Sequence, residues 1–329
     1  MQERGEHYTV SGKVEEREIR LMKKSVNNRM IALILAVLTV LLCACSSNDE
    51  TQVEETETVE IVEEVKTFDE VAVLFTGKML GANKSESDFG PIKERAEELK
   101  KQNIKVDIVD CGDYLSKDAT GTADAATSTL RAMASAGYSH AVINEREFDF
   151  GIEGLREFIA SEGMKNMSCN FRYSGFEDDI TARIPRYDVI EIGNVKIGYV
   201  AVSNPDVLES NKEIFIEDGR IAYGFCGRTS SFLGETVQAS INACLSEGVD
   251  KVILLSGITS SQKVGIAELL MMTSGVDACI CAFDSGSSET LELCGADNQP
   301  IMLGCLRGGA DSLGELRISP EGNITFSFK

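Results

Sequence analysis

Histidine, on which much hydrolytic and metal-dependent chemistry relies, occurs only twice in the 329 residues of the chain. His7 precedes the part of the chain that we expect to fold, so the folded domain holds one imidazole, that of His140. A metal site needs several convergent ligands, and we therefore interpret His140 as a surface or strand-edge residue. A Ser-His-Asp triad would have to recruit this same histidine, and the sequence has no GxSxG motif.

Cysteine offers little more for catalysis, although the chain has 10 of them. Cys111 would need a nearby base to become a nucleophile, and no motif supplies one. We interpret it, and the other cysteines of the strand-like runs, as small buried hydrophobic residues. Cys279 and Cys281 alternate along one such run and are expected to face opposite sides of it. No CxxC motif is present, and no spacing demands a disulfide.

Charge and composition exclude several classes of partner. The formal net charge is -21, tryptophan is absent and aromatic residues make up 6%. An acidic surface repels nucleic acid, and few rings are available to stack on bases, so we expect no nucleic-acid partner. The turn around Arg307 contains glycines but lacks the Lys-Ser/Thr ending of a phosphate-binding P-loop.

The pattern of the N-terminal region predicts a bacterial lipoprotein signal peptide. Residues 30–43 carry no charge and follow Lys23, Lys24 and Arg29, which is typical of a signal-peptide core behind a positive region. The sequence LCAC then resembles a lipobox that ends at Cys45. We expect cleavage before Cys45 and attachment of diacylglycerol to its sulfur. The alternative is a single membrane-anchor helix.

These features predict four regions. Residues 1–21 are interpreted as an extension upstream of a true start at Met22, although a long cytoplasmic N-region is the alternative. Residues 22–44 form the signal peptide, and residues 45–66 form the lipidated cysteine and an acidic tether that repels itself and extends. Residues 67–329 are predicted to fold as a single domain at the extracytoplasmic face of the bacterial cell membrane, with the membrane as partner through the lipid on Cys45.

Strand-like and helix-like runs alternate along the folded part. Strands are predicted at 71–75, 106–109, 141–143, 189–192, 195–202, 251–255, 278–281, 301–305 and 315–318, and helices at 91–101, 125–136 and 152–162. This order predicts an α/β protein with a mixed sheet or two packed sheets. Residues 209–232 are predicted to form a long, polar surface loop.

The order of sequence blocks resembles the metallophosphoesterase domain of bacterial 5'-nucleotidases. The most specific block, AGYSHAVINEREFDFGIEGL, is similar to the family's lGYDavtlGNHEFDyGleGL, and VDCGD is similar to lDAGD. The resemblance covers about residues 71–319. It implies a calcineurin-like fold, a four-layer α-β-β-α sandwich with its site at the carboxyl ends of strands. Family 5'-nucleotidases also carry a C-terminal nucleotide-binding domain, which we do not expect in this protein.

The resemblance also implies a site for two divalent metals held by Asp, Asn and His side chains, and this chain departs from that pattern. The bridging aspartate is kept as Asp113. The ligand asparagine becomes Glu145, and the catalytic histidine becomes Arg146, while its partner remains as Asp149. The remaining family ligand positions hold Lys78, Leu80, Gly257, Phe283 and Ser285.

Few metal ligands therefore remain, and we expect no metal cofactor. Asp113 and Glu145 are predicted to be metal-free remnants. We expect the cations of Lys78 and Arg146 to replace the metal charge by pairing with Asp113, Asp149 and Glu145. Such a cluster would be a structural network of salt bridges. Alternatively, Lys78 or Arg146 would contact a small anionic or phosphate ligand.

Three functions remain open on the sequence alone. The favoured one is a catalytically degenerate pseudoenzyme, a lipoprotein that binds or scaffolds a ligand or a still unknown protein partner. The second is an active hydrolase that uses Mn, Zn or Mg on nucleotides or other phosphate esters, through a site rebuilt around Asp110, Asp113, Asn144, Glu145, Glu147 and Asp284. The third is a solute-binding lipoprotein, which is disfavoured because such receptors usually have two similar lobes.

Overall fold

The computed structural model describes residues 66–329, except for 81–83, 116–122, 161–162, 176–178, 211, 228, 260–263 and 310. The signal peptide, Cys45 and nearly all of the tether predicted from the sequence lie outside the described residues. None of the described helices combines the length and the apolar character that crossing a bilayer requires.

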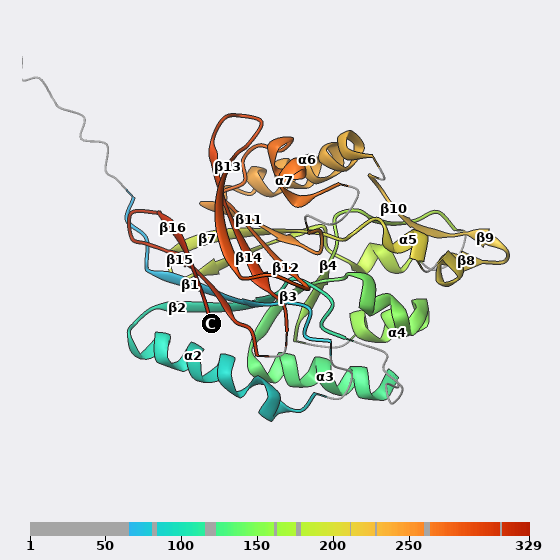
Figure 1. Ribbon diagram of the computed structural model, residues 1–329, viewed down its shortest axis with the longest axis horizontal. Helices are drawn as coiled ribbons and strands as arrows, with labels where there is room; N and C mark the ends of the chain where they lie inside the picture. The colour runs from blue at the N-terminus through green and yellow to red at the C-terminus, as the bar shows by residue number, and fades with distance from the viewer. Residues whose placement is uncertain are drawn as a thin grey trace, which may run out of the picture. The chain divides into compact units, whose positions relative to one another are not determined.

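Two six-stranded sheets form the framework of the domain (Figure 1). In spatial order the first sheet contains β16 (Ile324–Phe328), β15 (Gly314–Ile318), β1 (Val71–Thr76), β2 (Lys105–Asp110), β3 (Tyr138–Val142) and β4 (Lys165–Met167). The second contains β13 (Glu289–Cys294), β14 (Pro300–Arg307), β12 (Ala278–Phe283), β11 (Lys251–Ser256), β7 (Val195–Val202) and β6 (Tyr187–Ile192).

Both sheets have a parallel centre; the second has an antiparallel strand at each edge, whereas the first is antiparallel only at the edge of β15 and β16 and ends at the other edge in the parallel strand β4. β1 pairs in parallel with β2, and β11 pairs in parallel with both β7 and β12. Every residue of β1 is buried, because the strand is covered on both faces, and this explains its uninterrupted apolar sequence. Parallel strands end at the same edge of a sheet, so the loops that follow β1, β2 and β3 emerge together.

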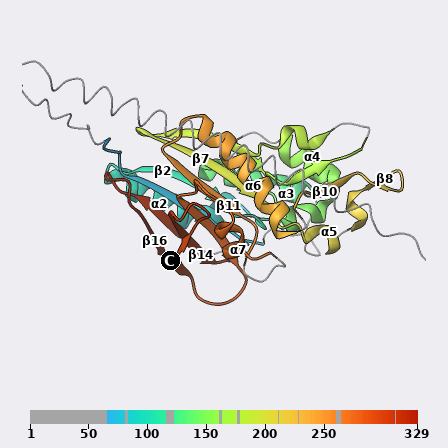
Figure 2. The same ribbon diagram turned by 90° about the horizontal axis from the view of Figure 1, so that it is seen from above.

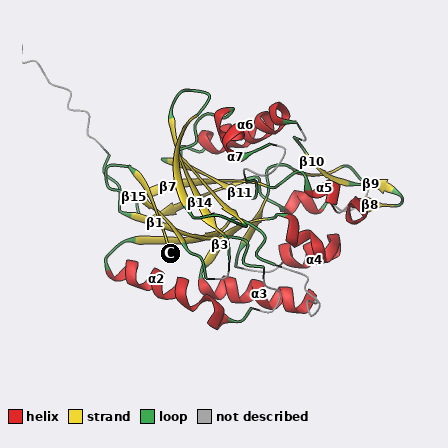
Figure 3. Cartoon of the chain, viewed as in Figure 1, coloured by secondary structure: helices red, strands yellow, loops and turns green. Residues whose placement is uncertain are grey.

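Helices cover the outer face of each sheet, as Figure 3 also shows. The first sheet packs against α2 (Gly90–Lys101), α3 (Ala123–Ala136) and α4 (Gly151–Ala160). The second packs against α6 (Ser230–Ser246) and α7 (Ile266–Met271), with α6 lying over β7 and β11 (Figure 2). Between the sheets lies a third apolar cluster, which includes Val73, Phe75, Ile197 and Ile253. The predicted four-layer α-β-β-α sandwich is therefore confirmed.

The helix predicted at 91–101 illustrates why these elements form where they do. Pro91 stands in the first turn of α2, where its missing N–H costs nothing. Ile92, Ala96 and Leu99 follow at helical spacing and are buried against the first sheet. Lys100 and Lys101 end the helix, where positive charge is favourable.

The prediction of a polar loop at residues 209–232 was wrong. The segment holds short elements: the end of α5 (Val207–Ser210), then η4 (Lys212–Phe215), β8 (Ile216–Glu217), β9 (Arg220–Ile221), β10 (Tyr223–Phe225) and the start of α6. β10 pairs with β5 (Phe171–Tyr173). Phe215 and Phe225 pack edge-on against Phe148, so scattered aromatic residues, not periodicity, hold this segment in the core. The remaining short helices are η1 (Glu86–Phe89), η2 (Glu145–Phe150) and η3 (Ile180–Arg183).

The expectation that His140 lies at the surface or at a strand edge was also wrong, because it is buried in β3, between β2 and β4. Its side chain is 2% exposed and lies on Tyr199, with ring centroids 5.0 Å apart. Nδ1 lies 2.7 Å from Ser139 Oγ, and Nε2 lies 2.9 Å from Asp188 Oδ2. β3 and β6 belong to different sheets, so this histidine connects the two sheets through contacts that no local pattern predicts.

Most of the described cysteines are buried thiols, as predicted, but Cys294 is exposed and Cys226 is half-buried. The expectation that Cys279 and Cys281 face opposite sides of their strand was wrong. Both belong to the apolar cluster on the helix-covered face of the second sheet. Residues two apart on a strand share a face, because the side-chain period of a strand is two.

Candidate functional site

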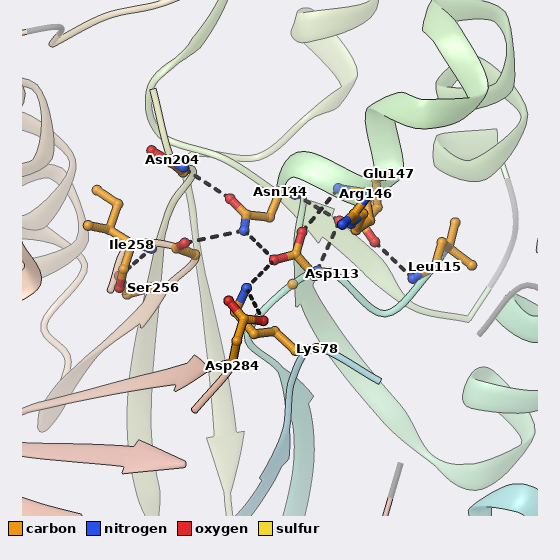
Figure 4. Close-up of polar contacts among 12 residues, drawn as sticks. Lys78, Asp113, Leu115, Asn144, Arg146, Glu147, Asn204, Ser256, Ile258 and Asp284 are labelled. Atoms are coloured by element: carbon orange, nitrogen blue, oxygen red, sulfur yellow. Dashed lines mark hydrogen bonds and ion pairs between the residues drawn. The ribbon is translucent and has the colours of Figure 1, made fainter. Parts of the chain in front are cut away.

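Six loops converge where the parallel strands of the two sheets end, and each contributes a polar or backbone group (Figure 4). β1 is followed by Lys78, β2 by Asp113, β3 by Asn144, β7 by Asn204, β11 by Gly257 and β12 by Asp284. These positions are far apart in the sequence. The parallel register of both sheets brings them to one edge.

Asp113 is the centre of this cluster, and its side chain is only 4% exposed. Its Oδ2 accepts hydrogen bonds from Lys78 Nζ at 3.0 Å and from Asn144 Nδ2 at 2.9 Å. Its Oδ1 accepts the backbone N–H of Arg146 at 3.0 Å. Three donors, one from the loop after β1 and two from the segment after β3, therefore neutralise and orient one buried carboxylate (Figure 4).

Lys78 supplies the only full positive charge that the structure places directly on Asp113 among the described residues. Its ammonium also lies 3.2 Å from Asp284 Oδ1, so the cation is shared by two carboxylates. Burial lowers the pKa of Lys78, but attraction to Asp113 and Asp284 outweighs burial, and the pKa lies above its ordinary value. Lys78 therefore stays charged at neutral pH.

The backbone at the two ends of this ion pair is unusual. Lys78 has a φ of 52° and Asp113 a φ of 57°, both in the left-handed region that non-glycine residues seldom adopt. Lys78 N donates to Gly112 O at 2.9 Å, which ties the first loop to the second. Non-glycine residues in the left-handed region persist only where the surrounding structure stabilises them, and they are found most often at functional sites.

Asn144 links the two sheets at the site. Its Nδ2 donates to Asp113 and, at 3.2 Å, to Gly257 O, while its Oδ1 accepts the N–H of Asn204 at 3.0 Å. A side chain at position 257 would collide with this amide, since an ideal Cβ there lies 2.4 Å from Asn144 Oδ1. The glycine is thus required for the observed position of Asn144.

The buried carboxyl groups of Glu147 and Asp110 accept hydrogen bonds from backbone N–H groups of the loops. Glu147 is fully buried, and its carboxylate accepts the N–H groups of Asn144, Asp113 and Leu115 at 2.9, 3.2 and 3.0 Å. Burial, followed by the charge of Asp113, raises the pKa of Glu147 to about 8. Burial raises the pKa of Asp110 to about 7, although Thr76 and the N–H of Gly112 bind it.

The other residues singled out from the sequence lie at the rim of the site. Arg146 reaches Asp149 at 3.5 Å, and its side chain is 47% exposed. Glu145 is half-buried and makes no hydrogen bond or ion pair with Asp113 among the described contacts. Leu80 is 48% exposed. Phe283 and Ser285 line a neighbouring pocket of about 430 Å³.

The comparison with solved structures identifies the architecture. The Haemophilus influenzae NAD nucleotidase matches with a TM-score of 0.60 at 16% identity, over 78% of this chain and 49% of that one. The Thermus thermophilus 5'-nucleotidase precursor matches with a TM-score of 0.58 at 15% identity, over 79% and 54%. The Bacillus subtilis calcineurin-like phosphoesterase YfkN matches with a TM-score of 0.57 at 15% identity, over 79% and 90%.

This chain has the calcineurin-like metallophosphoesterase fold. It spans about half the length of the NAD nucleotidase and of the 5'-nucleotidase precursor. No family model matches the sequence, and no curated protein matches it. At such identities the likeness shows the fold of the domain, and its activity must be argued from the side chains at the site.

At this edge of the metallophosphoesterase fold, Lys78 and Asn144 bind the carboxylate of Asp113, at the place where the resemblance implies metal ions. Within the described residues, no group of three or more His, Cys, Asp or Glu side chains is arranged to hold a metal ion. Both oxygens of Asp113 already accept hydrogen bonds, and an ammonium lies 3.0 Å from one of them. A cation at that position would meet the positive charge of Lys78, and like charges about 4 Å apart cost on the order of 4 kcal/mol at an intermediate dielectric.

Asn144 and Glu147 bind more groups of the site than the sequence led us to expect, since we named them only for a rebuilt hydrolase site. Together they form a capping box, in which the asparagine caps the short helix η2 and Glu147 returns to its backbone N–H. The spacing of an Asn and a Glu three residues later is a visible signal of this motif. The role of Gly257 had no such signal, since the space beside a glycine depends on a loop 113 residues away.

Proposed function

We propose that this chain is a catalytically degenerate relative of the metallophosphoesterases that acts as a binding or scaffolding lipoprotein at the extracytoplasmic face of a bacterial membrane. The observation that carries the proposal is the ammonium of Lys78, which lies 3.0 Å from Asp113. A positive charge on a side chain thereby takes the place that the resemblance assigns to a metal ion.

The contacts around Asp113 support a structural role for this ion pair. Its carboxylate binds one ammonium, one side-chain amide and one backbone N–H, so its hydrogen-bonding capacity is largely used. A two-metal hydrolase needs open coordination positions for water and substrate. Among the described residues, no group of three or more His, Cys, Asp or Glu side chains could hold a metal ion.

An anionic ligand would meet Arg146 rather than Lys78. The charge of Lys78 is shared between two carboxylates, and its side chain is 15% exposed. Arg146 makes one long contact of 3.5 Å with Asp149 and leaves nearly half of its side chain open to solvent. A guanidinium in this position can bind a phosphate or carboxylate through two parallel hydrogen bonds.

The membrane attachment rests on the sequence around Cys45. The uncharged run at residues 30–43, the basic residues before it and the LCAC sequence support cleavage and lipidation there. The acidic residues between Cys45 and the folded domain would hold the domain away from the bilayer. In this arrangement the domain presents its ligand or protein partner site outside the cytoplasm.

Metal content tests the loss of catalysis most directly. The purified full chain is incubated with manganese and zinc, dialysed, and analysed for metal per chain by mass spectrometry, and phosphomonoester and phosphodiester hydrolysis is assayed in parallel. We expect far less than one ion per chain and no metal-dependent turnover. One or two retained ions together with metal-dependent hydrolysis would replace this proposal with an active hydrolase.

Thermal stabilisation tests the binding role. Inorganic phosphate, AMP and small carboxylates are titrated into the wild-type chain while its melting temperature is followed, because a ligand that binds only the folded state raises that temperature. We expect an anion to stabilise the wild type and the Arg220→Ala variant, and to have little effect on Arg146→Ala. Arg220 is an exposed arginine on β9, remote in sequence from the site. An equal response of all three proteins would contradict a role for Arg146.

A further inference from the structure

Two thiols of the second sheet face each other across neighbouring strands. Cys281 on β12 and Cys305 on β14 are register partners in the parallel pairing of these strands. Their sulfur atoms lie 3.4 Å apart. Adjacent strands are about 4.8 Å apart, which lies within the Cα separation of roughly 4.4–6.8 Å that a disulfide spans.

The pair is held among apolar side chains but borders a cavity. Cys281 and Cys305 are 1% and 6% exposed, and both line a pocket of about 430 Å³. Phe283 and Leu303 form apolar parts of its wall, while Thr259 and Ser287 contribute hydroxyl groups. A small reagent that enters the pocket would therefore reach both sulfur atoms from the same side.

The other described cysteines do not share this arrangement. Cys279 is in register with Leu303, so no thiol lies opposite it on β14. Cys294 is exposed on the edge strand β13, in register with Pro300. Cys279 lies two residues from Cys281 along the chain, and Cys294 lies 11 residues from Cys305. Both are therefore internal controls for any reaction of the pair.

We propose that Cys281 and Cys305 form a redox-active dithiol that a disulfide oxidant, either a low-molecular-weight disulfide or that of a thiol–disulfide oxidoreductase, converts into an inter-strand disulfide. The juxtaposition of two register-paired thiols at the wall of one pocket carries the proposal. It goes beyond the binding role of the domain and does not depend on it.

Cys305 is the thiol that reacts first. The hydrogen bond that Cys281 donates to its sulfur lowers the pKa of Cys305, whereas the same contact, together with burial, raises the pKa of Cys281. The thiolate is the nucleophile in exchange. The Cys305 thiolate attacks one sulfur of the oxidant and releases the other as a thiolate. Cys281 then loses its proton to solvent, attacks the mixed disulfide at Cys305 and releases the second thiol, so two protein thiols are oxidised as one disulfide is reduced.

Oxidation would act on the candidate functional site through β12. Cys281 lies three residues before Asp284, whose carboxylate contacts Lys78 at 3.2 Å. A covalent link between β12 and β14 would fix the strand end from which the Asp284 loop leaves, and would reshape the shared wall of the pocket. The dithiol is thus placed to couple the redox state of the surroundings to the geometry of this loop.

Peptide mapping of the oxidised full chain tests the proposal. The reduced chain is treated with oxidised glutathione, remaining thiols are alkylated, and the protein is cut with trypsin and with a protease that cleaves before aspartate. Trypsin alone keeps Cys279, Cys281, Cys294 and Cys305 in one peptide, because no Lys or Arg lies between 263 and 307. Cleavage before Asp277, Asp284 and Asp297 separates residues 277–283 from 297–307 and leaves Cys294 in a third fragment.

We expect fragments 277–283 and 297–307 to become linked with the loss of two hydrogen atoms, and to separate again on treatment with dithiothreitol. The link should form equally in Cys279→Ser and be lost in Cys281→Ser, in which Cys305 instead retains glutathione. Full alkylation of Cys281 and Cys305 in the folded wild type, or a link through Cys279 or Cys294, would overturn the proposal. Fragment 277–283 holds both Cys279 and Cys281, so tandem mass spectrometry of the linked fragments must show the alkyl group on Cys279 and the link on Cys281. With that assignment the wild-type result decides the question even where a variant fails to fold, and circular dichroism reports folding of each protein.

Discussion

The side-chain amide of Asn144 fills the space that any side chain at position 257 would need. An ideal Cβ on Gly257 would lie 2.4 Å from Asn144 Oδ1 and 2.6 Å from its Cγ. The amide in turn binds Asp113, the carbonyl of Gly257 and the N–H of Asn204. A side chain at position 257 and this placement of Asn144 therefore exclude each other.

Gly257→Ala tests this relationship. The added methyl group meets a hydrogen-bonded amide in a buried site, so we expect the free energy of unfolding to fall by about 1–3 kcal/mol. In an Asn144→Ala background the collision is absent, and the same substitution should cost at least about 0.5 kcal/mol less. Urea denaturation of the four proteins of this cycle measures both values. Strict additivity would show that the two positions do not compete for space.

Lys78→Ala tests the ion pair at the centre of the site. Removing one partner of a buried pair costs about 3–5 kcal/mol, and we expect the lower end because Asp113 keeps its bonds from Asn144 and Arg146. Lys100→Ala is the control: Lys100 pairs with Glu97 at 3.0 Å, and both side chains are more than half exposed, so its loss should cost under about 1 kcal/mol. Equally small losses of unfolding free energy in the two variants would contradict a structural role for Lys78.

Asp188→Asn tests the ionic contact between the sheets. Burial raises the pKa of Asp188, but hydrogen bonds from His140 and Lys165 outweigh burial, and the pKa lies below 3.8. A carboxylate with a lowered pKa stabilises the fold above the unfolded-state value and loses that contribution as the pH falls through its folded-state pKa. We expect the variant to be about 2 kcal/mol less stable near pH 6. The difference should shrink as the pH falls below about 4.

That pH dependence is measured by denaturation of both proteins from pH 6 to strong acid. The difference between the proteins is the relevant quantity, since other carboxylates titrate equally in both. A constant difference across the whole range would mean that the asparagine variant disturbs packing, and that the charge of Asp188 is not what stabilises the contact.

Cys45→Ser tests the predicted anchor. We expect the wild-type chain to incorporate a labelled fatty acid and to sediment with membranes, and the variant to incorporate no label and to retain an uncleaved N-terminus, because lipidation precedes cleavage at a lipobox. Cys43→Ser is the matched control, since Cys43 precedes the predicted cleavage site. Labelling of the Cys45→Ser protein would contradict the assignment.

The fold could be predicted from the sequence because it is indicated by local hydrophobic periodicity and by the order of sequence blocks that resemble the family's. Apolar strand runs such as VAVLFT and amphipathic helices such as residues 90–101 are set by neighbours in the chain. The positions of Lys78 and Asp113 could also be predicted, since each follows a strand by a fixed short distance and parallel strands end together. Most of the individual contacts at these strand ends could not be predicted from the sequence.

Tertiary structure alone decided which groups other than Lys78 surround Asp113. The family resemblance implied a ligand-like role for Glu145, but in the structure the amide of Asn144 binds Asp113, because Gly257 from the other sheet leaves room for it. His140 is buried because Asp188 and Tyr199 of the second sheet cover it. Cys281 meets Cys305 through the register of β12 and β14. The sequence by itself determined most central strands of both sheets, the helices α2, α3 and α4, and their order, since those depend on local periodicity. It did not predict α6, α7 or the short elements within residues 209–232. It could not determine contacts between sheets, because these depend on the register and separation of strands that lie far apart along the chain.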